Sequence, residues 1–138
     1  NLQAAILNIK FQTFTADLER RRRLASIYDE GLHDIPELLL PPAPGSSPDH
    51  YDVYQNYEIE AERRDDLKKH LEGHGVRTII QFGGKAVHQY AGLGLTHYQL
   101  PRTELLYRRA LLLPINTSLS DDDVEYVVGC LRSFYGRA

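Results

Sequence analysis

The N-terminal stretch, residues 2–30, has the periodicity of a long amphipathic helix. It contains neither glycine nor proline, and its apolar residues recur three and four positions apart. These residues are Leu2, Ile6, Leu7, Ile9, Phe11, Phe14 and Leu18. Gly31 follows in the position of a C-terminal helix cap. The pattern predicts one helix roughly 43 Å long, or two helices with a kink between them, and either would reach beyond one small domain.

Residues 51–60 alternate with the period of two that is typical of a half-buried strand. Tyr51 and Tyr57 fall on one side of this pattern, and we expect both in the core. Tyr54 and Glu58 fall on the opposite side.

The remaining segments predict short elements separated by loops. We expect short strands at residues 38–40 and 112–115, a longer strand at 76–82, and helices at 61–72, 103–111 and 120–135, with a glycine-rich loop at 83–100. Ser120 and Asp123 have the spacing of a capping box at the start of the last helix. The prediction is an α+β fold, in which a long leading helix precedes a small antiparallel or mixed sheet with helices mainly on one face.

Composition narrows the class of protein without identifying it. With 138 residues, 42% hydrophobic and 25% charged, the chain is long enough for one domain with a core. Its net charge of -3 gives no general case for nucleic-acid binding. No apolar run is long enough for a membrane span, and no signal-peptide pattern is present. The single cysteine, Cys130, lies in an apolar helical stretch and is expected to be a small core residue, compatible with a reducing cytoplasm.

The start of the chain and its basic run each allow more than one interpretation. The chain begins without methionine and without a serine-type helix start, so we expect it to continue a longer protein.

The four arginines at 20–23 point in different directions around a helix, and acidic Asp17 and Glu19 lie beside them. This favours a solvated helix face over a nucleic-acid patch, although some of these arginines remain candidates for a phosphate or a partner subunit.

Histidine spacing gives no metal site. His70 and His74 are four positions apart, but Gly73 lies between them where the helix is expected to end, and no third ligand has matching spacing. We therefore predict no metal ligands.

The end of the strand at 76–82 and the glycine-rich loop after it carry the best candidates for a binding site: Gln81, Lys85 and His88. His88 has two interpretations, a hydrogen bond to the backbone or a contact to a ligand. Lys85 follows a glycine pair, which suggests phosphate binding, but the segment lacks the pattern of a phosphate-binding loop. It also lacks the apolar surroundings that would activate a lysine for Schiff-base chemistry, so Lys85 is not assigned as a cofactor lysine.

Several short motifs, in order along nearly the whole chain, resemble the DegT–DnrJ–StrS type of sugar aminotransferase. They lie at residues 2–7, 19–22, 28–32, 54–57, 64–67, 75–78, 83–85, 113–114 and 120–126. The resemblance implies the small C-terminal domain of the aspartate-aminotransferase architecture (fold type I). Residues 1–31 would then be a long connecting helix, and residues 32–138 the small domain. The large pyridoxal phosphate domain, with its Schiff-base lysine, would lie upstream of Asn1, so this chain would hold no catalytic residue.

The resemblance also implies a function for the full-length protein. Such enzymes are usually cytoplasmic homodimers that use pyridoxal phosphate to transfer an amino group, commonly from glutamate, to a nucleotide-linked keto-deoxysugar for surface polysaccharides or glycosides. This chain alone would be inactive, and Gln81, Lys85 and His88 would contact the substrate. Many members have histidine, tyrosine and proline where this chain has Gln81, Phe82 and Gly83. Many also have histidine where this chain has Gln55. These departures imply a distinct substrate subgroup.

Two alternatives belong to other classes of protein. One is a non-catalytic nucleotide-sugar-binding or interaction domain derived from the same family. The other is a small nucleic-acid-binding domain that uses the arginine run.

Overall fold

The computed structural model describes residues 1–137 and has the predicted α+β architecture. Its helices are α1 (Leu2–Phe11), α2 (Phe14–Leu32), α3 (Arg64–Gly73), α4 (Pro101–Arg109) and α5 (Asp121–Phe134). Its strands are β1 (Leu38–Leu39), β2 (Tyr57–Ala61) and β3 (Ala110–Leu113), and three short 3-10 turns, η1 (Gln81–Gly84), η2 (Val87–Gln89) and η3 (Ala91–Leu93), precede α4. The last helix has the predicted capping box, because Ser120 and Asp123 bond to each other's backbone N–H groups.

The sheet is antiparallel throughout, with strand order β1-β2-β3. In β2 the side chains alternate between two faces, as its sequence predicts. Tyr57 and Ile59 are buried, and Tyr57 lies opposite Leu113 of β3. Glu58 and Glu60 are half-buried on the other face. The sheet therefore has one core face and one open face.

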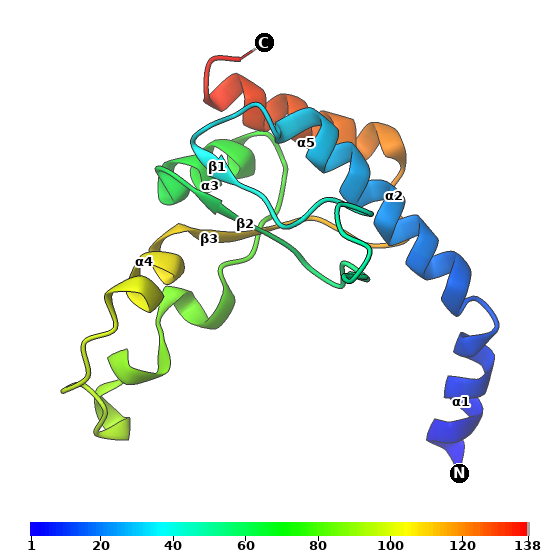
Figure 1. Ribbon diagram of the computed structural model, residues 1–138, viewed down its shortest axis with the longest axis horizontal. Helices are drawn as coiled ribbons and strands as arrows, with labels where there is room; N and C mark the ends of the chain where they lie inside the picture. Colours follow the sequence, from blue (N-terminus) through cyan, green and yellow to red (C-terminus); the bar gives the residue numbers. More distant parts are fainter. Residues whose placement is uncertain (138) are drawn as a thin grey trace.

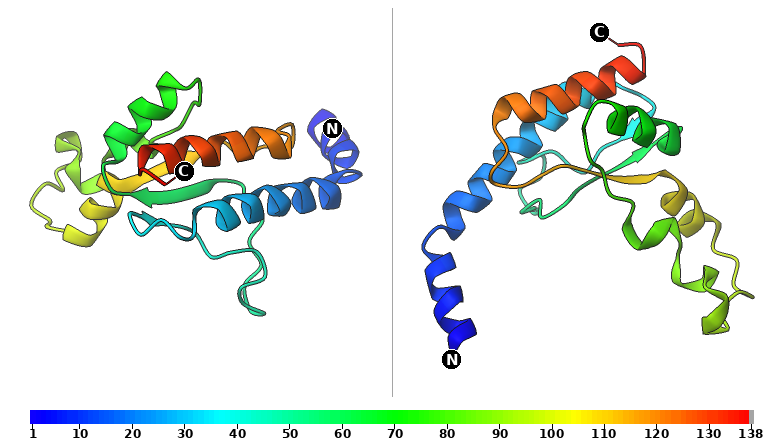
Figure 2. Two further views of the ribbon diagram at one scale, coloured as in Figure 1. Left: turned by 90° about the horizontal axis from the view of Figure 1, so that it is seen from above. Right: turned by 180° about the vertical axis from the view of Figure 1, so that it is seen from behind.

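Helices α2, α3 and α5 cover the core face, as predicted (Figures 1 and 2). The ring of Tyr28 on α2 packs on that of Tyr57, with centroids 4.7 Å apart, and its hydroxyl donates to the carbonyl of Pro114 at 2.7 Å. Each fully buried leucine of this core contributes about 1.5–3 kcal/mol. The core residues that are completely enclosed include Leu24, Leu32, Ile59, Leu67, Leu71, Leu111, Val124 and Leu131.

Gly31 does not cap the helix, so that prediction is wrong. It lies inside α2, which ends at Leu32 with His33 as the cap. A Cβ atom at Gly31 would lie only 2.5 Å from Cγ1 of Val128 on α5. Glycine is thus required for the close approach of two helices and not for a left-handed turn.

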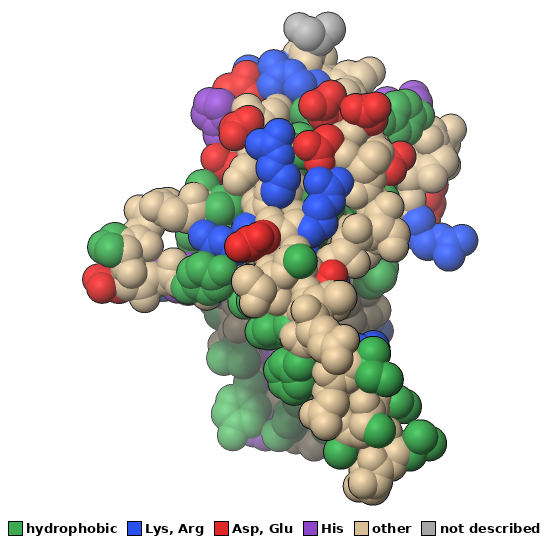
Figure 3. All heavy atoms as spheres, turned by 90° about the vertical axis from the view of Figure 1, so that its right-hand side faces the viewer, with side chains coloured by type: hydrophobic (Ala, Val, Ile, Leu, Met, Phe, Trp, Pro, Cys, Tyr) green, Lys and Arg blue, Asp and Glu red, His purple; other side chains and the backbone are tan. Residues whose placement is uncertain are grey.

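The predicted N-terminal helix is two helices, broken at residues 12–13. Asn1 caps the first of them, since its Oδ1 accepts a hydrogen bond from the amide of Ala4, a start signal that the sequence analysis missed. No residue of α1 is buried, and α1 projects away from the sheet with apolar side chains spread along it (Figure 3). Within residues 1–137, no helix combines the length and apolar character that a bilayer crossing requires.

The predicted strand at 51–60 is correct only from Tyr57 onward, and the prediction for Tyr51 is wrong. Tyr51 is 64% exposed, whereas Tyr54, expected on the opposite face from Tyr57, is 2% exposed and stacks on the Tyr57 ring. The direct cause is the backbone of Tyr54, whose φ of +46° interrupts the alternation of an extended strand. The side chain of Asp52 stabilises this turn by accepting from the amide of Tyr54 at 2.8 Å.

The predicted strand at 76–82 is likewise reduced to one bridge between Ile79 and Leu112. The chain then enters η1, where Phe82 and Gly83 have positive φ values of 51° and 63°. Extended pairing with β3 cannot continue through such a turn.

The arginine run links α2 to two other parts of the fold. Arg20 and Arg23 pair with Asp121 at the start of α5. Arg21 and Arg22 donate to backbone carbonyls of residues 52–55. Because the four side chains diverge around α2, as the sequence predicts, they form two separate sets of internal contacts and no common basic stripe.

Candidate functional site

The open face of the sheet leads directly into the glycine-rich loop. Glu58 on β2 lies opposite Leu112 on β3, and Leu112 is bridged in turn to Ile79. Directly opposed residues point to the same face of a sheet, so these three side chains form one row across the open face. Gln81, two residues beyond Ile79, begins η1 at the edge of this row.

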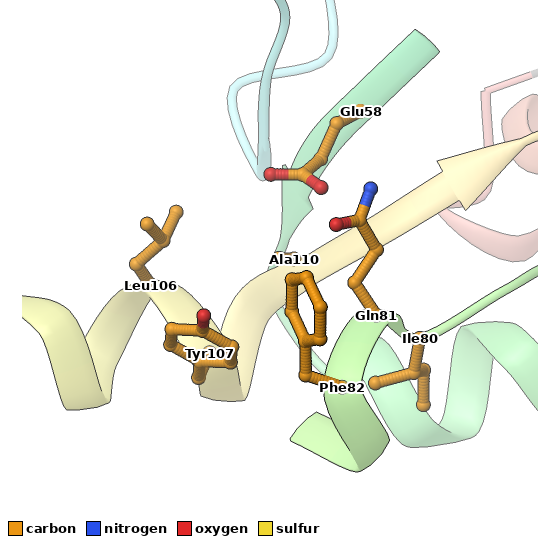
Figure 4. Close-up of a pocket in the computed structure, with 7 residues that line it drawn as sticks. All are labelled: Glu58, Ile80, Gln81, Phe82, Leu106, Tyr107 and Ala110. Atoms are coloured by element: carbon orange, nitrogen blue, oxygen red, sulfur yellow. The ribbon is translucent and has the colours of Figure 1, made fainter. Parts of the chain in front are cut away.

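A hollow of about 70 Å³ lies between this face, η1 and the end of α4 (Figure 4). The turn beside it is fixed by the hydroxyl of Tyr90, which donates to the carbonyl of Phe82 at 2.7 Å. The left-handed conformation of Phe82 costs about 1–2 kcal/mol, and it leaves the ring 69% exposed at the rim. The residues that line the hollow are Glu58, Ile80, Gln81, Phe82, Leu106, Tyr107 and Ala110.

Glu58 and Gln81 bring two polar side chains together at this mainly apolar hollow, which the phenol of Tyr107 also lines. The carboxylate of Glu58 and the carboxamide of Gln81 point toward one another beside Ala110 (Figure 4). A carboxylate accepts hydrogen bonds only, whereas a carboxamide both donates and accepts. The pair can therefore hold a group that is itself both donor and acceptor.

Glu58 was not among the residues that the sequence singled out. Its signal was the alternation along β2, which places Glu58 away from the core face, but alternation does not reveal what lies across the sheet. The pairing of β2 with β3, and of Leu112 with Ile79, brings it to Gln81.

His88 lies in a different environment from Gln81. Its side chain is buried, with Nε2 3.1 Å from Oε1 of Glu104 on α4, and it lines a wider, mainly apolar hollow of about 480 Å³. The hydrogen bond from His88, followed by that from the amide of Leu100, lowers the pKa of the Glu104 carboxyl. The pair thus fastens the loop to α4. Other residues that line this second hollow are Ala86, Val87, Leu95, Tyr98, Thr103 and Tyr107.

Lys85 is exposed and lines neither of these hollows. It stands between Gln81 and His88 along the chain, so the three predicted residues share one segment but have three different surroundings. Among the described residues, Tyr107 alone lines both hollows.

A third hollow, of about 230 Å³, opens further along the same sheet face. Its polar side chains are those of Gln55, Asn56, Arg77 and Asn116. Arg77 has no ion-pair or hydrogen-bond partner within residues 1–137, and no carboxylate lines this hollow. The open face therefore carries a carboxylate near Gln81 and a guanidinium near Gln55.

The described residues do not by themselves fit pyridoxal phosphate, the cofactor that the resemblance implies. It is attached through the amine of a lysine, which a desolvated site activates. The four lysines of the chain are Lys10, Lys68, Lys69 and Lys85; none is buried, and Lys68 pairs with Glu72.

His70 and His74 each bond to the backbone. Their rings are in contact at an interplanar angle of 39°, with centroids 4.3 Å apart. His70 contacts the carbonyl of Cys130, and His74 contacts that of His70. In the part of the chain that the structure describes, no three potential metal ligands gather.

Comparison with known proteins relates almost the whole chain to one family. The model of the DegT/DnrJ/EryC1/StrS aminotransferase family matches residues 1–132. The pleiotropic regulatory protein of Geobacillus stearothermophilus is 32% identical over 137 residues, which cover 97% of this chain and 36% of that protein. The dTDP-3-amino-3,4,6-trideoxy-alpha-D-glucose transaminase of Streptomyces venezuelae is 32% identical over 139 residues, covering 99% and 36%.

Solved structures agree with these relatives. DesV of S. venezuelae, in complex with a ketimine intermediate, superposes with a TM-score of 0.86 at 30% identity over 99% of this chain and 36% of that one. A DegT DnrJ EryC1 StrS aminotransferase from Brucella abortus gives a TM-score of 0.82 at 32% identity over 97% and 35%. The chain thus spans about 36% of the length of the curated relatives that it matches.

Proposed function

The chain belongs to the DegT/DnrJ/EryC1/StrS aminotransferase family, and we propose that it is the C-terminal part of a pyridoxal-phosphate-dependent sugar aminotransferase. The reaction proposed for the full-length protein is transfer of an amino group, with glutamate as donor, to a keto-deoxysugar nucleotide. The observation that carries this proposal is the family match over residues 1–132, together with a relative named as a transaminase of a dTDP-linked sugar. The cofactor supplies the amino-transfer chemistry, and its lysine is expected outside this chain.

The proposed division of the chain follows the predicted boundaries. Residues 1–31 connect to the cofactor domain, and residues 32–138 form the small domain. The apolar, unburied α1 supports this role, because apolar side chains along a projecting helix favour contact with further protein. The C-terminal half of α2 also contributes Leu24 and Tyr28 to the core of the small domain, so the connection is anchored firmly.

Gln81, Lys85 and His88 are proposed to serve the substrate in different ways. Gln81 would contact it in the hollow beside Glu58. Lys85, exposed and cationic, would attract the nucleotide phosphates. His88, fastened to Glu104, would hold the loop that carries the other two.

We further propose a cytoplasmic homodimer. Exposed apolar side chains of the loop support an interface, since Phe82, Val87, Leu93 and Tyr98 are each more than half exposed. Size-exclusion chromatography with light scattering of the full-length protein tests this expectation, and a monomer at micromolar concentration would refute it.

The function itself is tested by purifying the full-length protein and recording its absorbance spectrum and its glutamate-dependent amination of dTDP-linked keto-deoxysugars. We expect bound pyridoxal phosphate and formation of 2-oxoglutarate together with an amino sugar. Binding of a nucleotide sugar without bound cofactor or turnover would instead support a non-catalytic binding domain.

A further inference from the structure

We infer that the hollow beside Gln81 is a subsite for one ring hydroxyl of the sugar, and that Glu58 is a residue that determines specificity for it. The inference rests on the proposed function, because it assigns a part of the sugar nucleotide to a place on this chain. It concerns a residue that lies outside the predicted set of Gln81, Lys85 and His88.

The hydrogen-bonding groups of the hollow select the chemistry of its occupant. Glu58 can only accept, and Gln81 can donate through its NH₂ group. A hydroxyl group satisfies both, since it donates to the carboxylate and accepts from the carboxamide. Neither side chain has a hydrogen-bond partner within residues 1–137, so both are available to a ligand.

The negative charge of Glu58 excludes the diphosphate of a nucleotide sugar from this hollow. The Glu58 carboxylate would repel a phosphate at close range, and no lysine or arginine lines the hollow. The diphosphate must therefore lie outside, and the sugar enters with a hydroxyl-bearing carbon.

The size of the hollow also limits how much of the sugar can enter it. A volume of about 70 Å³ is well below the roughly 300–1,000 Å³ of pockets that enclose a whole drug-sized ligand. There is room for a carbon and its hydroxyl but not for a whole hexose. The walls formed by Ile80, Leu106 and Tyr107 are apolar and suit the C–H groups on either side of that carbon.

The hollow exists because β3 begins with a small side chain. Ala110 lies opposite Glu60 in the register and faces the same side as Leu112. A larger residue at position 110 would extend into the space between Glu58 and Gln81. The sheet therefore supplies the acceptor from β2 and the space from β3.

The test measures binding to the full-length protein by calorimetry with two probes. One is dTDP-4-dehydro-6-deoxy-D-glucose, which has hydroxyls at C2 and C3, and the other is dTDP-4-dehydro-2,3,6-trideoxy-D-glucose, which lacks both. Glu58→Val should weaken binding of the hydroxylated probe about tenfold, and that of the deoxygenated probe less than about twofold. Ala110→Val should show the same preference, because it fills the hollow and leaves the polar groups in place.

The matched control is Glu60→Val, on the same strand and the same face but outside the hollow. It should change neither affinity, and thermal unfolding of all three variants checks that each is folded. If both probes bind the wild-type protein and Glu58→Val leaves their ratio unchanged, the subsite is wrong while the proposed function stands. If the wild-type protein binds neither probe and carries no pyridoxal phosphate, the proposed function fails and the subsite with it.

Discussion

His88 and Glu104 join the glycine-rich loop to α4 through a single contact, with Nε2 of the imidazole 3.1 Å from Oε1 of the carboxylate. The same carboxylate oxygen also accepts from the amide of Leu100, at the start of α4. Glu104 thus holds a loop residue and a helix terminus at once. Glu104 therefore fixes His88 relative to α4, while Gln81 follows the Ile79–Leu112 bridge and lies in the turn that the Tyr90–Phe82 hydrogen bond closes.

The first prediction concerns the acid stability of this contact. Hydrogen bonds from His88 and from the amide of Leu100 lower the pKa of Glu104 from its ordinary 4.5. A carboxyl group whose pKa is lower in the folded state contributes stability that is complete above the unfolded-state pKa and is lost as the pH falls through the folded-state pKa. The melting temperature of the full-length protein should therefore fall as the pH drops below about 4.5, and less steeply in Glu104→Gln. The exposed Glu125→Gln is the control, and equal slopes for Glu104→Gln and wild type would show that the contact is not energetically coupled to folding.

The second prediction compares two tyrosines whose rings touch. The hydroxyl of Tyr28 donates to the carbonyl of Pro114, whereas that of Tyr57 is buried without a hydrogen-bond partner among the described residues. Tyr28→Phe should reduce the free energy of unfolding by about 1 kcal/mol, because the carbonyl of half-buried Pro114 loses its donor. Tyr57→Phe should be neutral or stabilising, since it removes an unsatisfied polar atom. Denaturant unfolding measures the free energy of unfolding of the two variants, which differ only in which hydroxyl is deleted. Equal losses would mean that the Tyr57 hydroxyl has a partner outside this chain or in solvent.

Local signals explain which parts of the fold the sequence predicts well. The capping box of Ser120 and Asp123 is encoded within four consecutive residues and is found as expected. The alternation from Tyr57 onward also depends only on neighbours in the chain. By contrast, the left-handed turn at Tyr54 is held by Asp52 and by arginines of α2, and Gly31 is explained only by Val128, far along the chain. A distant element takes part at both of these positions, whereas the missed cap at Asn1 and the turn at Phe82 and Gly83 are local.

The candidate site, too, has a part that local sequence predicts and a part that it does not. Gln81, Lys85 and His88 are close in sequence, so a loop pattern is enough to select their segment. It does not reveal that His88 is buried against Glu104 while Lys85 faces solvent. Glu58 joins the site only through the registers of β2 with β3 and of β3 with Ile79, and no single segment carries that information.

The third prediction tests the helix cap that the sequence identifies. Ser120 Oγ accepts from the amide of Asp123 at 3.0 Å, and the Asp123 carboxylate accepts from the amide of Ser120 at 2.8 Å. Ser120→Ala should lower the free energy of unfolding by about 1 kcal/mol, because an amide at the start of α5 loses its acceptor. Ser120→Asp, which can still accept, should recover most of that loss. Thermal unfolding measures the stability of both variants. A loss of the same size in Ser120→Asp would mean that the loss in Ser120→Ala does not come from the missing cap hydrogen bond.

The fourth prediction concerns the closest approach of α2 and α5. A Cβ at Gly31 would lie 2.5 Å from Cγ1 and 3.2 Å from Cγ2 of Val128, so Gly31→Ala must push the helices apart or distort Val128. Overpacking of this kind costs about 1–3 kcal/mol, even though alanine favours helix more than glycine does. Val128→Ala removes both methyl groups that cause the clash, and the double variant should recover most of the loss. The interaction energy from a double-mutant cycle in urea separates the two explanations, because a simple helix-propensity effect would make Gly31→Ala stabilising and additive with Val128→Ala.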